Sequence, residues 1–325
     1  MPDTFYIVAD IGGTNARFAA FQGAQQIKLV VYDTKGGMDL LSMAEAFSAD
    51  LPSKPAVAVA ALAGPVQGNS GRLTNANQTL HGNDLGNVTG ASQAHIINDF
   101  AAAAWATHTV RNSDLSVLIG PSTPEQGTRL AIGPGTGLGV GTLIHAEGRS
   151  FAVPGEGGHI GIAPNGRFEN EVFQALRKLW PDIFFGDAQI IEAEGILSGT
   201  GLPFLYEAIC QVLDVTCDGL DGRAIFEAAR NGSNSAAVET VKAFKTHLAR
   251  VAGDLGLATG ATGGVYMLGG IALKNPWIFD DIFVSAFREG GRFTQAREAM
   301  GLYLLNCEDF GIQGAYRYAT VIAEN

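Results

Sequence analysis

Near its start the chain carries a glycine turn, Asp10-Ile11-Gly12-Gly13-Thr14-Asn15-Ala16-Arg17, with an apolar run on each side. Residues 5–9 precede the turn and residues 18–21 follow it. Short apolar runs bounded by turn residues are typical of buried strands. Two such strands joined by a glycine turn predict a β-hairpin.

A second glycine-rich turn lies further along, in Ala131-Ile132-Gly133-Pro134-Gly135-Thr136-Gly137-Leu138-Gly139-Val140-Gly141. When Gly13-Thr14 is superposed on Gly135-Thr136, apolar residues follow in both segments. Internal similarity of this kind indicates a repeated structural unit. We therefore expect two related lobes, each opening with a hairpin whose turn is the size of a phosphate group.

Other parts of the chain alternate between short apolar runs and helical periodicity. We expect strands at residues 57–62, 94–97 and 265–268. Apolar residues recur at helical spacing over residues 238–255, and a further helix is expected from about residue 313 to residue 323. Alternating strands and helices predict an α/β fold.

Composition narrows the classes of function. A length of 325 residues fits two domains, or two lobes that share a cleft. Hydrophobic residues make up 46% of the chain, which is enough for a sizeable core without metals or cross-links. The formal net charge is −11 and no cluster of Lys and Arg occurs, so we expect no nucleic-acid partner.

Cysteine usage and hydropathy bear on the compartment. Cys210, Cys217 and Cys307 have no close CxxC spacing, which favours free thiols in a reducing environment. No apolar run reaches the roughly 18–20 residues that cross a bilayer, and no signal-peptide pattern is found. We expect a cytoplasmic protein with no membrane partner.

Three glycine turns could bind phosphate groups: residues 10–14, residues 133–137 and Gly269-Gly270. Glycine permits backbone N–H groups to converge on an anion. The P-loop pattern and the GxGxxG dinucleotide fingerprint are both missing, so a nucleotide site would be of another type. The alternative is that these glycines only form tight turns and close packing.

Two aspartates end predicted strands. A carboxylate beside a phosphate turn is repulsive unless a cation lies between, so Asp10 indicates Mg²⁺, although it could also cap its own turn. Asn98-Asp99 follows the strand predicted at residues 94–97. Asp99 could accept the proton of an attacking hydroxyl, and the alternative is that the pair forms a helix N-cap.

The segment Glu156-Gly157-Gly158-His159 combines an acceptor with a group that donates and accepts. Its two glycines disfavour a helix and no second Glu-x-x-His occurs, so a bundle-type metal site is not expected. A loop of this kind suits sugar hydroxyls. Glu194, just before Leu197-Ser198-Gly199-Thr200-Gly201, could add an acceptor, and the alternative for it is an ordinary surface glutamate.

Taken together, the chain resembles the bacterial glucokinases of the hexokinase, Hsp70 and actin superfamily. The resemblance rests on five motifs in order along nearly the whole chain: residues 10–17, Asn98-Asp99-Phe100, residues 135–139, Glu156-Gly157-Gly158-His159 and Leu197-Ser198-Gly199. It implies two lobes with ribonuclease-H-like mixed sheets and a cleft between them. The smaller lobe would comprise residues 1–109 and 302–325, and the larger lobe residues 110–301.

The resemblance also implies roles for individual residues. Asp99 would be the base on the sugar 6-hydroxyl. The sugar would be bound by Asn77, Asn98, Asp99, Glu156, His159 and Glu194. The nucleotide would be bound by Asp10, Gly12, Gly13, Thr14, Asn15, Gly135, Thr136, Gly137, Gly269 and Gly270, with Asp10 facing Mg²⁺ through water.

Two positions depart from the family pattern. The family often has Trp after an Asn-x-x stretch near the sugar, whereas Leu80 follows Asn77-Gln78-Thr79 here. The family also tends to carry an acidic residue soon after the glutamate–histidine segment, and Gly161-Ile162 occupy that place. Both departures concern the identity of the sugar and the detail of the cleft.

The function implied is ATP-dependent phosphorylation of glucose with Mg²⁺ by a cytoplasmic homodimer. A kinase for fructose or mannose, a sugar sensor without turnover and an actin-like filament protein are the alternatives. Asp99 beside Asn98 argues against a sensor, and a filament protein would leave Glu156 and His159 unexplained. The donor could be ATP, ADP or polyphosphate.

Overall fold

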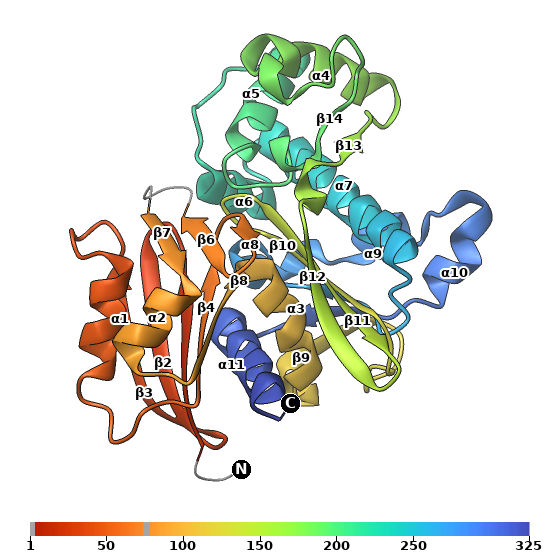
Figure 1. Cartoon of the computed structure of the whole chain (residues 1–325). Helices are drawn as coiled ribbons and strands as arrows, with labels where there is room; N and C mark the ends of the chain where they lie inside the picture. The colour runs from red at the N-terminus through yellow and green to blue at the C-terminus, as the bar shows by residue number, and fades with distance from the viewer. Residues whose placement is uncertain (1–3, 74–77, 325) are drawn as a thin grey trace.

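Two mixed β-sheets form the framework of the computed structural model, which describes residues 4–73 and 78–324 (Figure 1). The first sheet has the spatial order β3 (Gln25–Asp33), β2 (Asn15–Gln22), β1 (Phe5–Ile11), β4 (Val57–Leu62) and β8 (Gln93–Asn98). Strands β1 and β2 are antiparallel and pair Asp10 with Arg17, which confirms the first predicted hairpin. Strands β1, β4 and β8 run parallel.

The second sheet repeats this beginning. Its order is β12 (Arg149–Gly155), β11 (Leu138–Ala146), β10 (Arg129–Pro134), β15 (Val265–Met267), β16 (Leu302–Leu305) and β9 (Leu115–Ile119). Strands β12, β11 and β10 are antiparallel neighbours and β15 joins β10 in parallel, as β3, β2, β1 and β4 do in the first sheet. The second hairpin and the internal repeat are therefore confirmed, and the class is α/β.

Within the described residues, five short strands lie outside the two main sheets, and short 3-10 helices occur in the connecting segments. The short strands are β5 (Val66–Gln67), β6 (Ser70–Leu73), β7 (Gln78–His81), β13 (Gly161–Ile162) and β14 (Ile191–Glu192). The 3-10 turns are η1 (Asn112–Asp114), η2 (Gly157–His159), η3 (Pro181–Ile183), η4 (Ala193–Gly195), η5 (Pro276–Ile278) and η6 (Gly291–Phe293).

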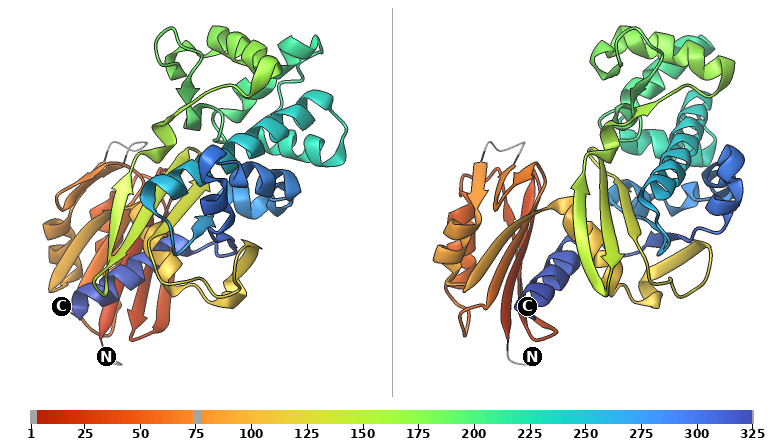
Figure 2. Two further views of the ribbon diagram at one scale, coloured as in Figure 1. Left: turned by 90° about the vertical axis from the view of Figure 1, so that its right-hand side faces the viewer. Right: turned by 45° about the vertical axis from the view of Figure 1, so that its right-hand side comes forward.

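Alternation along the strands gives each sheet two buried faces. On β1, Ile7 and Ala9 face helices α1 (Leu40–Ser48) and α2 (Gly82–Thr89), while Tyr6 and Val8 face α11 (Phe310–Ala323). A side-chain period of two explains the division. Helices α11 and α3 (Asp99–Thr109) thus form a layer between the two sheets (Figure 2).

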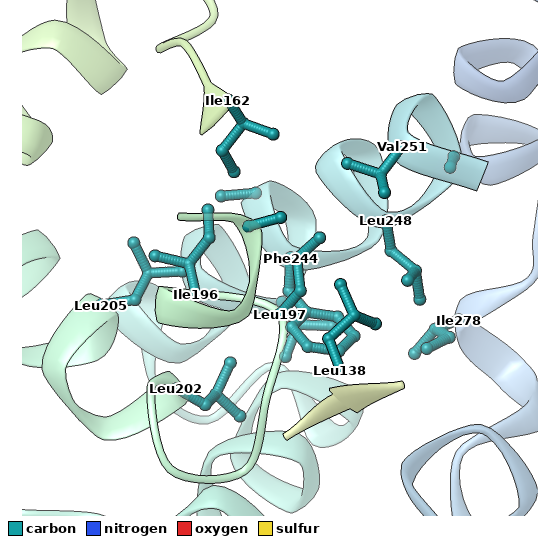
Figure 3. Packing of buried hydrophobic residues seen from close by; sticks show 14 of the residues in the cluster. Leu138, Ile162, Ile196, Leu197, Leu202, Leu205, Phe244, Leu248, Val251 and Ile278 are labelled. Atoms are coloured by element: carbon teal, nitrogen blue, oxygen red, sulfur yellow. The ribbon is translucent and has the colours of Figure 1, made fainter. Parts of the chain in front are cut away.

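The outer face of the second sheet carries the largest cluster of buried side chains in the described chain. The helices on this side and beyond are α4 (Gly166–Leu179), α5 (Leu202–Leu213), α6 (Gly222–Asn231), α7 (Ser235–Thr259), α8 (Gly270–Lys274), α9 (Asp281–Arg288) and α10 (Thr294–Glu298). Helix α7 contains the predicted periodic segment, and the side chain of Asn234 caps it by accepting from the Ala237 N–H. In Figure 3, Leu138, Ile196 and Leu197 lie in this cluster around Phe244.

Helix α11 begins at Phe310, earlier than predicted, because Gly311 does not interrupt it. A Cβ atom at Gly311 would lie 2.6 Å from Cγ of Asp10. The glycine therefore lets the first turn of α11 approach the aspartate closely. The proposed division into lobes stays a prediction, and β16 at its C-terminal boundary pairs within the second sheet.

The N-terminus of helix α3 packs against the alternating glycines of the second hairpin. A Cβ atom at Gly139 would lie 1.7 Å from Cε2 of Phe100, and one at Gly141 would lie 2.0 Å from the Phe100 carbonyl oxygen. Side chains at these positions would push α3 away from the sheet. The glycines therefore fix the position of Asp99, the residue before Phe100.

Within residues 4–73 and 78–324, no helix combines the length and the apolar character needed to cross a bilayer.

Replacing Gly139 with alanine tests this packing. We expect Gly139→Ala to lower the free energy of unfolding by about 1–3 kcal/mol, because the added methyl group overlaps the Phe100 ring. Urea unfolding followed by circular dichroism gives the value. Gly155→Ala is the matched control, since a Cβ atom there meets no atom within 4 Å. Equal losses of stability in the two variants would contradict the packing argument.

Candidate active site

Asp10 and Asp99 lie at the same edge of the first sheet. Asp10 is the penultimate residue of strand β1, and Asp99 is the first residue after strand β8. Strands β1, β4 and β8 are parallel neighbours, so their carboxyl ends meet. This edge is where open α/β sheets bind their ligands.

Asp99 is poised to exchange a proton near neutral pH. Burial raises the pKa of its carboxyl group to about 7, and the negative charges of Asp10 and Glu156 add to the effect. The Phe100 N–H donates to Asp99 Oδ1 at 3.0 Å, which opposes the shift. Glu156 follows strand β12 of the second sheet, so charges from segments of both sheets act on Asp99.

Asn98 caps helix α3, as one of the two sequence alternatives predicted. Its Oδ1 accepts from the N–H groups of Phe100 at 2.9 Å and Ala101 at 3.2 Å. Its Nδ2 donates to the Gly64 carbonyl at 3.2 Å. These bonds orient the strand-to-helix turn that carries Asp99. Contact between Asn98 and a sugar stays a prediction.

Asp10 is a partly buried carboxylate that lies near one positively charged side chain, Arg17, and one negatively charged side chain, Asp309. Burial raises the pKa of its carboxyl group, nearby Arg17 lowers it and nearby Asp309 raises it again. Arg17 Nη1 lies 3.7 Å from Asp10 Oδ2 and 4.0 Å from Asp309 Oδ1. A cation would relieve this charge.

In the described ranges, no group of three or more His, Cys, Asp or Glu side chains could hold a metal ion. Mg²⁺ typically binds through one or two carboxylates together with phosphates and water. Asp10 fits that arrangement, because it supplies one carboxylate beside a glycine turn. A metal ion at Asp10 would need further ligands, such as phosphate oxygens and water.

The turn at residues 135–137 is held from two sides. Within it, the Gly135 N–H donates to the Gly137 carbonyl at 2.8 Å. From outside, the Gly199 N–H donates to the Gly135 carbonyl at 2.8 Å, and Thr200 Oγ1 donates to the Thr136 carbonyl at 2.9 Å. The Leu197-Ser198-Gly199 motif therefore fixes the turn. In the first hairpin, the Gly12 N–H donates to the Asn15 carbonyl at 2.9 Å.

A cavity of about 950 Å³ opens beside this second turn. Among the predicted residues, it is lined by Gly135, Thr136 and Gly270. The cavity is also lined by residues outside the sequence motifs, including Arg223, Phe226, Lys274, Asn275 and Trp277. The cavity is large enough for a nucleoside. Gly269 has a φ of +91°, and a Cβ atom there would lie 2.9 Å from the Pro134 carbonyl oxygen.

Glu156 and His159 form a tight loop against β11. The His159 N–H donates to the Glu156 carbonyl at 3.0 Å. A Cβ atom at Gly158 would lie 2.2 Å from the Leu138 carbonyl oxygen, so this position requires glycine. His159 Nε2 lies 4.0 Å from Glu156 Oε2.

Glu192 lies beside His159, although none of the sequence motifs includes it. Its Oε2 lies 3.1 Å from His159 Nδ1, and this bond raises the pKa of His159. Burial of the ring opposes the shift, and the charges of Glu194, Glu192 and Glu156 favour it. Glu192 pairs with Gly161 across β13 and β14, so it places a carboxylate opposite the position where an acidic residue was expected. A second glutamate two residues before Glu194 was the available indication.

Glu194 contacts the end of the second turn. Its Oε2 accepts from the Leu138 N–H at 2.7 Å, and a Cβ atom at Gly137 would lie 2.4 Å from the same oxygen. One carboxylate oxygen is therefore committed to the backbone, and binding of a sugar by Glu194 stays a prediction. Leu138 and Leu197 are buried in one cluster, which supports the turn (Figure 3).

Two further sequence predictions concern the first sheet. Asn77 lies outside the described residues. Leu80, at the position where the family often has Trp, is buried in the cluster between the first sheet and helices α1 and α2. Gly13 and Thr14 lie in the turn between β1 and β2, and Asn15 is the first residue of β2; Thr14 and Asn15 are exposed.

Comparison with known proteins gives consistent matches. The family model described as "Glucokinase" matches residues 7–321. The glucokinase of Nitrobacter hamburgensis is 35% identical over 294 residues, which are 88% of each chain. A crystal structure of a glucokinase from an Antarctic psychrotroph has 28% identity and a TM-score of 0.86, and the match covers 98% of this chain and 99% of that one. A ROK-family glucokinase from Streptomyces griseus, in complex with glucose and AMPPNP, has 19% identity and a TM-score of 0.60, with 98% of this chain and 99% of that chain covered.

Substitution of Asp99 should change the pH dependence of stability. Since the carboxyl pKa is about 7 in the fold and 3.8 ordinarily, folding binds a proton between these values, and stability is lost as the pH rises through that window. Asp99→Asn removes the cost of ionisation. We expect its free energy of unfolding to exceed that of the natural protein by about 2–4 kcal/mol near pH 8, with little difference near pH 4.

Urea unfolding measured across this pH range tests the prediction. Asp182→Asn, which changes an exposed carboxylate, is the control and should follow the natural protein. A stability gain for Asp99→Asn that does not vary with pH would show that the Asp99 carboxyl is not perturbed.

Proposed function

This chain belongs to the glucokinase family, and from that membership we propose that it transfers the γ-phosphoryl group of ATP to the 6-hydroxyl of glucose. The relative from Streptomyces griseus was solved with glucose and AMPPNP, an ATP analogue, which supports both substrates. The observation in this chain that supports the proposal is the buried carboxyl of Asp99, with a pKa of about 7, next to Phe100, which packs against the glycines of the second hairpin.

In the proposed reaction, Asp99 accepts the proton of the sugar 6-hydroxyl while that oxygen attacks the γ-phosphorus in line with the leaving oxygen. A base is effective when its pKa lies near the working pH, which fits Asp99. Phosphoryl transfer depends mainly on positioning and on charge stabilisation. The hydrogen bonds of Asn98 and the glycine contacts of Phe100 supply the positioning of Asp99.

The nucleotide would lie along the second turn. We assign its phosphates to residues 12–15 and 135–137, and its adenosine to the cavity beside Gly269 and Gly270. Phe226 and Trp277 line the same cavity and offer aromatic surface to a base. Mg²⁺, held by Asp10 through water and by the phosphates, would neutralise the charge on the transferred group.

The sugar would lie between Asp99 and the loop at residues 156–159. Glu156, His159 and Glu194 would bind ring hydroxyls, with Asn98 and Asn77 on the opposite side. Each hydroxyl both donates and accepts, so carboxylates and an imidazole suit it. Closure of the two lobes would exclude water, which otherwise competes as an acceptor of the phosphoryl group.

Two finer assignments belong to the same proposal. We place the protein in the cytoplasm, in keeping with its free cysteines and its substrates. We also propose a homodimer. Light scattering of the purified protein measures the oligomeric state, and a monomer at micromolar concentration would refute the dimer.

A coupled assay for ADP tests the reaction. With ATP, Mg²⁺ and a panel of hexoses, we expect turnover with glucose to exceed turnover with fructose and mannose. Asp99→Asn should lower kcat by about 10²–10⁴-fold, because the base is lost while the hydrogen-bonding shape is kept. Asp182→Asn serves again as the control. Near-normal turnover in Asp99→Asn would refute its role as the base.

A further inference from the structure

We propose that Glu192 is a positioning residue that holds the imidazole of His159 in one orientation, with Nδ1–H directed at its carboxylate, for sugar binding. The inference rests on the proposed function, in which His159 contacts the sugar. It begins from the 3.1 Å contact between Glu192 Oε2 and His159 Nδ1.

The backbone holds the two residues together. Strands β13 and β14 pair Gly161 with Glu192, and the Ala193 N–H donates to the Ile160 carbonyl at 2.9 Å. The ladder thus continues up to the residue after His159. Because Gly161 has no side chain, Glu192 has no competitor on the opposite strand position.

The contact decides which ring nitrogen carries a proton. An ionised carboxylate can only accept, so Nδ1 of His159 must donate to Glu192. Nε2 is then left for another ligand, and it points to the side of Glu156, whose Oε2 is 4.0 Å away. A hydroxyl between Nε2 and Glu156 would meet one group on each side.

The surrounding charges favour the doubly protonated ring. Glu192, Glu194 and Glu156 are the acidic groups that act on His159, and all three raise its pKa, whereas partial burial lowers it. In the imidazolium form Nε2 also donates. A charged donor makes a stronger hydrogen bond to a sugar oxygen than a neutral one.

Two substitutions separate orientation from charge. Glu192→Gln keeps an oxygen that accepts from Nδ1 but removes the negative charge. Glu192→Ala removes both. The glucose KM should rise with pH as the His159 ring loses its second proton, and Glu192→Gln should move this rise to lower pH. Glu192→Ala should raise the KM about 10-fold or more at every pH, because a hydrogen bond to a charged group is lost. The change in KM should exceed the change in kcat, because Asp99 is not touched.

Nuclear magnetic resonance of ¹⁵N-histidine-labelled protein gives a second readout that does not depend on turnover. The chain has 6 histidines, and a His159→Gln sample assigns the resonance. We expect the Nδ1-protonated tautomer at high pH in the natural protein and a lower His159 pKa in Glu192→Gln. Glu171→Gln, which removes an exposed charge on α4, is the matched control and should change neither readout.

The outcomes are distinguishable. An unchanged tautomer and pKa of His159 in both Glu192 variants would overturn the proposal. A changed titration with an unchanged glucose KM would overturn its sugar-binding half while the kinase activity stands. If the natural protein turned over no hexose, the proposed function would fail, and the resonance data would still decide whether Glu192 controls His159.

Discussion

The contact between helix α3 and the bare backbone of the β10–β11 hairpin fixes the geometry of the whole site. Phe100 occupies the space that side chains at Gly139 and Gly141 would fill. The same hairpin ends in the turn at residues 135–137, so one close approach sets the distance between Asp99 and the phosphate-sized turn. Gly139 and Gly141, which belong to the glycine-rich hairpin that indicated a ligand site, therefore also allow the helix with the proposed base to pack closely against the sheet.

The acidic side chains near Asp99 and His159 impose a second constraint, because they shift the pKa values of both residues. The charges of Asp10 and Glu156 act on Asp99, and those of Glu156, Glu192 and Glu194 act on His159, while Arg17 lies 3.7 Å from Asp10. Burial of Asp99 raises its pKa toward neutrality, which destabilises the fold at high pH but leaves a carboxyl that can accept a proton at the working pH. The reactivity of the site and its cost in stability have the same physical origin.

Local patterns predicted much of this structure. The two hairpins, the topological repeat, the cap at Asn98 and helix α7 follow from turn residues and periodicity over short stretches. Contacts between distant segments did not follow. The pairing of Glu192 with His159 needs the β13–β14 ladder, and the wall of the cavity joins residues 223–226 to residues 274–277. The local pattern also gave no indication that Gly311 lies in α11 against Asp10.

In the proposed reaction, the buried carboxyl of Asp99 receives the proton of the sugar hydroxyl. The pH dependence of kcat/KM for glucose, at saturating ATP and Mg²⁺, tests this role most directly, because the ratio reports ionisations of the enzyme before glucose binds. We expect this ratio to rise with unit slope through an apparent pKa of about 7, and to fall at higher pH only where His159 loses its second proton. A profile that stays flat through that region, with the protein folded throughout, would contradict the account.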